Sequence, residues 1–158
     1  MSLEREITIS NESKNLSQVR RLVSEVLEET SFDREMRNKI IVAVDEALAN
    51  VVEHAYQGGQ GDIRIGFALD AEVLQVMIRD NGTPFDPGDR LRDTVDIHNH
   101  IKLGLKGGLG LFLMRRIMDE VRYSRDGEDF VNELRMIKRL PEASADAASA
   151  GVGQEPGA

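Results

Sequence analysis

The stretch Asp62-Ile-Arg-Ile-Gly-Phe-Ala-Leu-Asp-Ala-Glu-Val-Leu-Gln-Val-Met-Ile-Arg-Asp80 repeats large apolar residues at every second position on both sides of a short polar connection. Such alternation is typical of strands that bury one face, and the connection Asp70-Ala71-Glu72 is short enough for a hairpin. The stretch therefore predicts two adjacent antiparallel strands.

One strand and two helices are expected before this hairpin. Residues 3–9 alternate in the same way, whereas the apolar residues within 16–27 recur at the spacing of a helix. Asp33 suits the N-cap of a second, longer helix, whose apolar stripe spans residues 36–55. The glycine pair Gly58-Gly59 predicts where that helix ends.

After the hairpin, residues 80–108 show little periodicity, and a loop of this length is usually functional or mobile, so we expect a lid. A further helix is expected from about Leu111, and alternation around 121–123 and 130–137 predicts two final strands. The order β-α-α-β-β-loop-α-β-β favours the α+β class, as a two-layer α/β sandwich with helices on one face of a mixed, mostly antiparallel sheet.

The chain has 158 residues, of which 41% are hydrophobic, and this suffices for one core. Residues 1–140 are therefore expected to form a single domain. Residues 141–158 are rich in Ala, Ser and Gly and offer almost nothing large to bury, so they are expected to form a disordered tail.

Composition excludes several classes of protein. The absence of cysteine rules out disulfides and zinc-thiolate sites. A net charge of -8 with scattered basic residues argues against direct binding to nucleic acid. No apolar run approaches the roughly 18 residues of a membrane span, and acids stand near the N-terminus where a signal peptide would be basic. We therefore expect a cytoplasmic protein with no membrane segment.

The first candidate motif lies on the second predicted helix, where Glu46 and Asn50 are four residues apart. This spacing puts both side chains on one face, which we expect to lie opposite the apolar stripe. A carboxylate can accept a proton, and an amide oxygen suits Mg²⁺. Taken alone, the pair is more simply explained as a solvated helix face.

The second motif, Asp80-Asn81-Gly82-Thr83-Pro84-Phe85-Asp86, leaves the hairpin through a turn in which glycine permits close backbone approach. Alone, it is a turn. Its functional interpretation is that Asp80 accepts a hydrogen bond from an exocyclic amine, which would select adenine over bases that lack this donor.

The third motif, Gly107-Gly108-Leu109-Gly110-Leu111, runs directly into a predicted helix, so its amides could cradle phosphates. It fits neither a P-loop nor a dinucleotide fingerprint in its context. Lys106 or Lys102 could meet terminal phosphate charge, although such lysines are more often only solvated.

Together, the three motifs resemble the N box and two glycine boxes of the GHKL (Bergerat) ATPases, a superfamily that includes gyrase, histidine kinases and the mismatch-repair ATPases. The closest resemblance is to the serine-kinase anti-sigma factors. Those proteins share the single bare ATPase domain and the variants Asn-x3-His-Ala-Tyr and Gly-Gly-Leu-Gly-Leu-x-Leu-Met. The resemblance covers about residues 3–140.

The resemblance implies a partner-switching kinase that uses ATP and Mg²⁺. Such a protein sequesters a sigma factor and phosphorylates a serine or threonine on a small anti-anti-sigma protein of the STAS type. The resemblance also implies a homodimer.

The resemblance assigns roles to individual residues. Glu46 would be the general base, Asn50 the Mg²⁺ ligand and Asp80 the adenine contact. Gly82 would let the base approach the backbone. The phosphates would be lined by Gly107, Gly108, Gly110 and Leu111. His54 has no assigned role, because a histidine at the edge of a helix face is usually a packing or capping residue.

The sequence departs from the family pattern at two positions. Many relatives carry a threonine near the adenine on the last strand, whereas the alternation here points Asn132 inward at that place, where it could replace the threonine. Some relatives have arginine where this chain has Lys106, and lysine offers a point charge instead of a planar fork.

Three alternatives remain open at this point. The chain could be an ATP-dependent binding module that holds a regulatory partner without phosphoryl transfer. It could be the catalytic half of a histidine kinase, although the 32 residues before Asp33 leave no room for dimerisation helices with a phosphoacceptor histidine. The motifs could also be accidental turns and caps, which their joint spacing makes the least favoured explanation.

Overall fold

The structure is a computed structural model, and it describes residues 2–56, 59–83, 108–125 and 130–141. Within these ranges the secondary structure follows the predicted order. The elements are β1 (Leu3–Ser10), the short 3-10 helix η1 (Ser13–Asn15), α1 (Leu16–Glu28), α2 (Arg34–His54), β2 (Asp62–Leu69), β3 (Val73–Asp80), α4 (Gly108–Ile117), β4 (Glu120–Ser124) and β5 (Asn132–Arg139).

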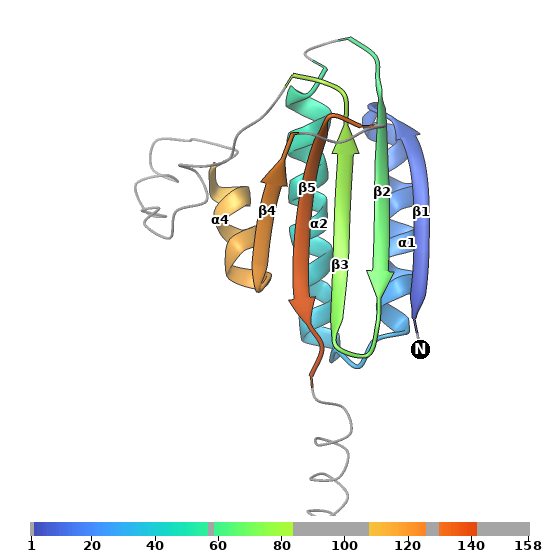
Figure 1. The fold of residues 1–158 in the computed structure, drawn as a ribbon, viewed down its shortest axis with the longest axis vertical. Helices are drawn as coiled ribbons and strands as arrows, with labels where there is room; N and C mark the ends of the chain where they lie inside the picture. Colours follow the sequence, from blue (N-terminus) through green and yellow to red (C-terminus); the bar gives the residue numbers. More distant parts are fainter. Residues whose placement is uncertain (1, 57–58, 84–107, 126–129, 142–158) are drawn as a thin grey trace, which may run out of the picture.

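The five strands form one sheet in the order β1-β2-β3-β5-β4, and each neighbouring pair is antiparallel. The predicted hairpin is β2 and β3, with Ile65 opposite Ile78. Helices α1 and α2 lie side by side behind the sheet in Figure 1, and α4 lies toward the β4 edge. The predicted α+β class with two layers is confirmed.

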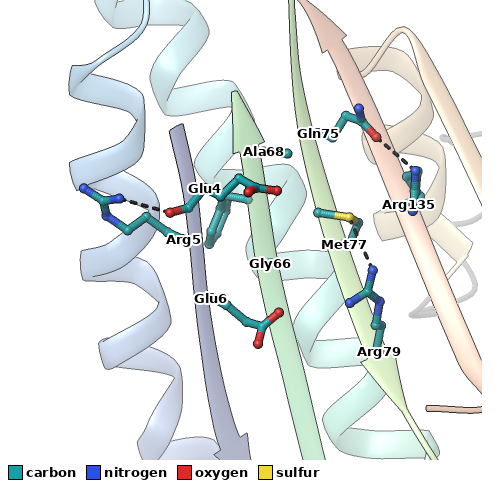
Figure 2. Close-up of a pocket in the computed structure, with 10 residues that line it drawn as sticks. Glu4, Arg5, Glu6, Gly66, Ala68, Gln75, Met77, Arg79 and Arg135 are labelled. Carbon is teal, nitrogen blue, oxygen red and sulfur yellow. Dashed lines mark hydrogen bonds between the residues drawn. The ribbon is translucent and has the colours of Figure 1, made fainter. Parts of the chain in front are cut away.

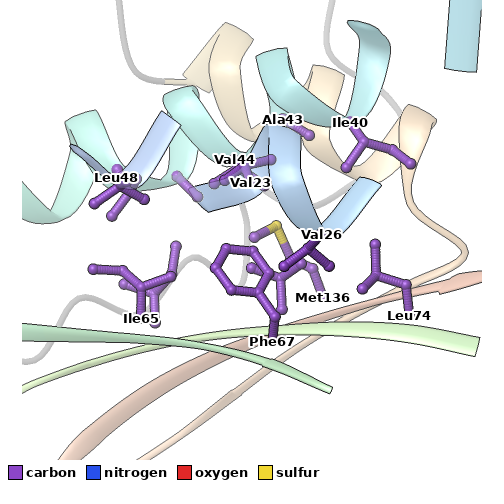
Figure 3. Close-up of a cluster of buried hydrophobic side chains, with 14 of the residues drawn as sticks. Val23, Val26, Ile40, Ala43, Val44, Leu48, Ile65, Phe67, Leu74 and Met136 are labelled. Carbon is purple, nitrogen blue, oxygen red and sulfur yellow. The ribbon is translucent and has the colours of Figure 1, made fainter. Parts of the chain in front are cut away.

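The core fills the space between the helices and the sheet (Figure 3). The inward side chains of the strands include Ile65, Phe67 and Met136, all almost fully buried. They meet the apolar stripes of α1 and α2, whose central members are Val23, Val26, Ile40, Val44 and Leu48. The alternation of the strands and the helical spacing seen in the sequence therefore converge on one core.

Helix α2 begins where the sequence predicts and ends earlier. The Asp33 side chain accepts a hydrogen bond of 2.8 Å from the backbone N of Met36, which confirms the N-cap. The last helical residue is His54, four residues before Gly58. The carbonyl of Ala55 accepts a hydrogen bond from the backbone N of Thr83, beyond β3. A contact distant in sequence therefore fixes the end of the helix before the glycines are reached.

The opposite face of the sheet carries no helix among the described residues. A shallow hollow of about 490 Å³ lies on this face. Figure 2 shows the residues that line it, among them the small residues Gly66 and Ala68. Glu4 and Glu6 line one side of the hollow, and Arg79 and Arg135 line the other. Within the described ranges, no helix is both long and apolar enough to cross a membrane.

Candidate functional site

Two of the predicted site residues meet at the ends of neighbouring strands. Asp80 is the last residue of β3, Asn132 is the first residue of β5, and the sheet register pairs them directly. Both are buried, with 6% and 1% of their surfaces exposed. The prediction that Asn132 points inward is confirmed, because its alternation with the buried Leu134 and Met136 continues to the end of the strand.

A hydrogen-bond network fixes this pair. Asn132 Nδ2 donates to Asp80 Oδ1 at 2.9 Å and to the Gly82 carbonyl at 3.0 Å. The backbone N of Gly82 also donates to Asp80 Oδ1, at 2.9 Å. Because one end of the Asn132 amide faces two acceptors, that end must be the NH₂ group, and the other end must be the carbonyl oxygen. That atom, Asn132 Oδ1, is buried and accepts no hydrogen bond from any described residue.

Asn50 presents a second unsatisfied amide. Its side chain is only 8% exposed, and its Nδ2 atom has no hydrogen-bond partner within the described parts of the chain. The prediction that it lies on a face opposite the apolar stripe is therefore wrong. Helix α2 packs against both β3 and α4, so a wide arc of its surface is buried. Glu46, one turn earlier on α2, is half-buried.

The phosphate-cradle motif is described in part. Gly108, Gly110 and Leu111 form the first turn of α4, which starts slightly before the predicted position and packs against α2. Gly107, the first residue of the motif, lies outside the described residues, as do Lys106, Lys102 and residues 84–107 of the predicted lid. His54 ends α2.

Gly82 is held tightly against the end of α2. A Cβ atom added at this position would lie 2.1 Å from the Ala55 carbonyl oxygen and 2.4 Å from its carbon. Backbone atoms cannot yield as the tip of a side chain can. The approach of α2 to the turn therefore already requires glycine at position 82, independently of any bound base.

We expect Gly82→Ala to lower the free energy of unfolding by about 1–3 kcal/mol, because the added methyl group must displace backbone at the end of α2. Urea denaturation measures this change. Gly66→Ala is the matched control, since there the new Cβ would lie 3.3 Å from the flexible tip of Met77. Equal losses in the two variants would contradict the packing assignment.

Tyr56 and Asn81 join the site although the sequence assigned them no role. The Tyr56 hydroxyl donates to the Asp62 carbonyl at 2.6 Å and accepts from the backbone N of Asn81 at 2.9 Å. Asn81 Oδ1 accepts from the backbone N of Val131 at 2.8 Å. Both residues stand inside the quoted motifs, so the motifs themselves were the only signal that could have found them.

The surroundings of Tyr56 raise the pKa of its phenol. Burial is the main cause, and the nearby carboxylates of Asp80 and Asp62 act in the same direction, while the hydrogen bond from the Asn81 amide acts against them. The hydroxyl therefore keeps its proton, and its ability to donate, to a higher pH than an ordinary tyrosine does.

This raised pKa predicts a loss of stability at high pH. Above about pH 10, the ordinary value for tyrosine, the unfolded chain has lost a proton that the folded protein still holds, so stability falls as pH rises through the folded pKa. Denaturation midpoints between neutral pH and about pH 11 measure it. Tyr56→Phe should show a shallower fall, and identical pH profiles would contradict the assignment.

A second hollow, of about 540 Å³, lies near the start of α2 and is lined by residues that include Asp33, Met36 and Lys138. Neither this hollow nor the one on the open sheet face includes any candidate site residue. The candidate site is instead defined by the hydrogen-bonded pair at the end of β3 and the start of β5, which the turn after β3 joins to the residues that follow α2.

Comparison with known proteins gives a consistent result. Residues 9–138 match the family model described as histidine kinase-like ATPase domain. A serine-protein kinase RsbW of Bacillus cereus is 32% identical over 124 residues, which span 77% of this chain and 77% of the relative. The protein of that name from Listeria monocytogenes is 33% identical over 107 residues, 66% of this chain and 68% of the relative. One from Bacillus anthracis is 38% identical over 88 residues, 54% of each chain.

Proposed function

The chain belongs to the histidine kinase-like ATPase domain family, and from this membership we propose that it is a serine/threonine-protein kinase that uses ATP and Mg²⁺. Similar proteins that carry the name serine-protein kinase RsbW support this class. The observation that carries the proposal is the buried pair Asp80 and Asn132. Beside the turn that follows β3, this pair has oxygen atoms that accept no hydrogen bond from the described residues.

The adenine would bind against this pair. Both hydrogen bonds described for Asp80 are accepted by Oδ1, which leaves Oδ2 to accept one from the exocyclic amine of the base. Asn132 Oδ1 also lacks a hydrogen-bond partner among the described residues, but it is closed to solvent, so Asp80 Oδ2 is the acceptor assigned to the amine. A base with a carbonyl at this position would face acceptors only, so the pair favours adenine over guanine.

The residues at the other end of the site fit Mg²⁺ and phosphates. No described residue accepts a hydrogen bond from Asn50 Nδ2, so the amide is not held by that end, and its oxygen could bind a hard cation. No cluster of three or more carboxylates or histidines stands ready for a metal within the described ranges, so the ion would be held mainly by phosphate oxygens together with Asn50. Bound Mg²⁺ would neutralise phosphate charge. The amides at Gly108, Gly110 and Leu111 begin a helix and suit phosphate oxygens, with Gly107 and Lys106 immediately before them.

Glu46 would act as the general base. It lies one turn before Asn50, the proposed Mg²⁺ ligand, so it would be close to the phosphates. Its side chain is only half-buried, so an incoming serine or threonine could reach it. Its carboxylate would take the proton of a serine or threonine hydroxyl. The hydroxyl oxygen then bonds to the γ-phosphorus while the bond to the leaving ADP breaks, so the products are ADP and a phosphorylated partner.

For the partners we propose a sigma factor, which the protein sequesters, and a small anti-anti-sigma protein of the STAS type, which receives the phosphate. We also propose a homodimer, and residues 1–140 as the ATP-binding domain followed by a tail at 141–158. These assignments rest on the resemblance of the three motifs to anti-sigma kinases. The alternative is a binding module in which ATP controls the hold on a partner without phosphoryl transfer.

Incubation with Mg²⁺ and γ-labelled ATP, with and without a STAS-type protein, tests this function. The kinase proposal expects label on a serine or threonine of the partner, and only when the native protein is present. Tight ATP binding with no label on any protein would favour the binding module instead.

A further inference from the structure

One hydroxyl links three segments of the fold next to the proposed adenine contact. Tyr56 lies two residues beyond the end of α2, and its OH contacts the carbonyl of Asp62, where β2 begins. The same OH accepts from the amide of Asn81, the residue directly after β3. We propose that Tyr56 is a positioning residue for nucleotide binding, a role that rests on the proposed function.

The link needs a group that donates and accepts at the same time. The Asp62 carbonyl accepts and the Asn81 amide donates, and here both bond to the hydroxyl, so the group between them must donate to one and accept from the other. A hydroxyl satisfies both, whereas phenylalanine satisfies neither. Tyr56 is protonated at neutral pH, as a tyrosine ordinarily is, and its raised pKa extends that state to higher pH.

The fold makes room for the ring of Tyr56. A Cβ added at Gly61 would lie 2.1 Å from ring carbons, so the ring lies directly against the backbone there. Asn11 fixes that stretch of backbone, because its Oδ1 accepts from Gly61 N at 3.2 Å and its Nδ2 donates to the Gly59 carbonyl at 2.9 Å. The backbone beneath the tyrosine ring is therefore held in place by Asn11.

Tyr56 completes the attachment of the turn formed by Asp80, Asn81 and Gly82. Asn132 holds the Asp80 end of this turn, and Asn81 Oδ1 accepts from Val131 N, so β5 secures one side. The contact of Gly82 with Ala55 and the Tyr56 bond secure the other side, toward α2. Since α2 also carries Asn50, Tyr56 sets the adenine contact relative to the proposed Mg²⁺ ligand.

The link through the Tyr56 hydroxyl affects the position of the turn after β3 more than it affects the free energy of unfolding. Asp62 and Asn81 are both exposed, so water can replace the hydroxyl as their partner when it is removed. The replacement satisfies the backbone groups but no longer ties them together. Loss of the hydroxyl should therefore weaken nucleotide binding while the chemical step proceeds normally once ATP is bound.

The test compares native protein with Tyr56→Phe, and Tyr123→Phe is the matched control because Tyr123 is the only other tyrosine. We expect Tyr56→Phe to raise the ATP dissociation constant and KM by about fivefold to tenfold, as for loss of one hydrogen bond. The kcat value at saturating ATP should stay unchanged. Amide exchange at Asn81, measured without nucleotide, should become faster, and Tyr123→Phe should match the native protein in all three measurements.

A second variant, Asn11→Ala, loosens the surface beneath the ring without altering Tyr56, and it should shift ATP affinity in the same direction. Unchanged ATP affinity in Tyr56→Phe, or an equal loss in Tyr123→Phe, would overturn the positioning role. If native protein bound no ATP, the proposed function would fail, and the exchange measurement alone would decide whether the Tyr56 link exists.

Discussion

Glu46→Gln is expected to lower the rate of phosphoryl transfer by about 10²- to 10⁴-fold, the usual contribution of a general base. Glutamine keeps the size of the side chain and its place on α2, but its amide cannot take the proton of the attacking hydroxyl. ATP binding should change little, because the nucleotide contacts proposed here belong to Asp80, Asn132 and Asn50. Single-turnover transfer from labelled ATP measures the rate, and calorimetric titration measures the binding.

Glu35→Gln is the matched control for this experiment, since Glu35 lies in the first turn of the same helix, far from Asn50. Among the described residues, its side chain pairs with the exposed Lys39. It should transfer phosphate at the native rate. Loss of ATP binding in Glu46→Gln, or full transfer activity, would remove Glu46 from the role of base.

Asp80→Asn is expected to weaken ATP binding by about 10²-fold, because a charged acceptor is exchanged for a donor that faces the amine of the base. The hydrogen bonds at this position determine which atom of the new side chain faces the base. Asp80 Oδ1 accepts from Asn132 Nδ2 and from Gly82 N, and the oxygen of an asparagine can do the same. Its NH₂ group must then occupy the place of Oδ2, where the adenine amine is proposed to bind.

The same reasoning predicts that Asp80→Asn stays folded, with a denaturation midpoint close to that of native protein. Asp70→Asn is the control, because Asp70 Oδ1 likewise accepts from two backbone amides, those of Glu72 and Val73, at the far end of the hairpin. ATP affinity equal to that of native protein in Asp80→Asn would contradict the adenine contact. An equal loss in both variants would show that the effect is not local.

Much of the fold could be predicted because its signals are local. The N-cap at Asp33 depends on residues three positions away, and the hairpin depends on alternation within 62–80. The inward direction of Asn132 followed from the same kind of alternation within residues 130–137. In each case the physical cause lies within a few residues of its effect.

The parts that could not be predicted depend on contacts between distant segments. Helix α2 ends at His54 because the Ala55 carbonyl meets Thr83, and no local pattern announces that contact. Asn50 is buried on a helix that packs against α4 as well as β3, and a single apolar stripe does not indicate the second contact. The bond between Tyr56 and Asn81 likewise joins residues 25 positions apart, so the motifs contained both residues without revealing their relation.

The three motifs were more informative together than singly. Each alone is explained by a turn, a cap or a solvated helix face. In the structure, Asp80 and Gly82 share a network with Asn132, while Gly82 also contacts the residue that follows α2, the helix of Glu46 and Asn50. The glycines of the third motif begin α4, which packs against the same helix. All three motifs therefore lie on α2 or in segments that pack against it or its end.

Recognition of adenine by the hydrogen-bond network of Asp80 and Asn132 is measured by equilibrium titration of native protein with ATP and with GTP, each with and without Mg²⁺. We expect ATP to bind, Mg²⁺ to strengthen its binding, and GTP to bind at least tenfold more weakly because its carbonyl would face the carboxylate of Asp80. Equal affinity for the two nucleotides, or no binding of ATP, would contradict it.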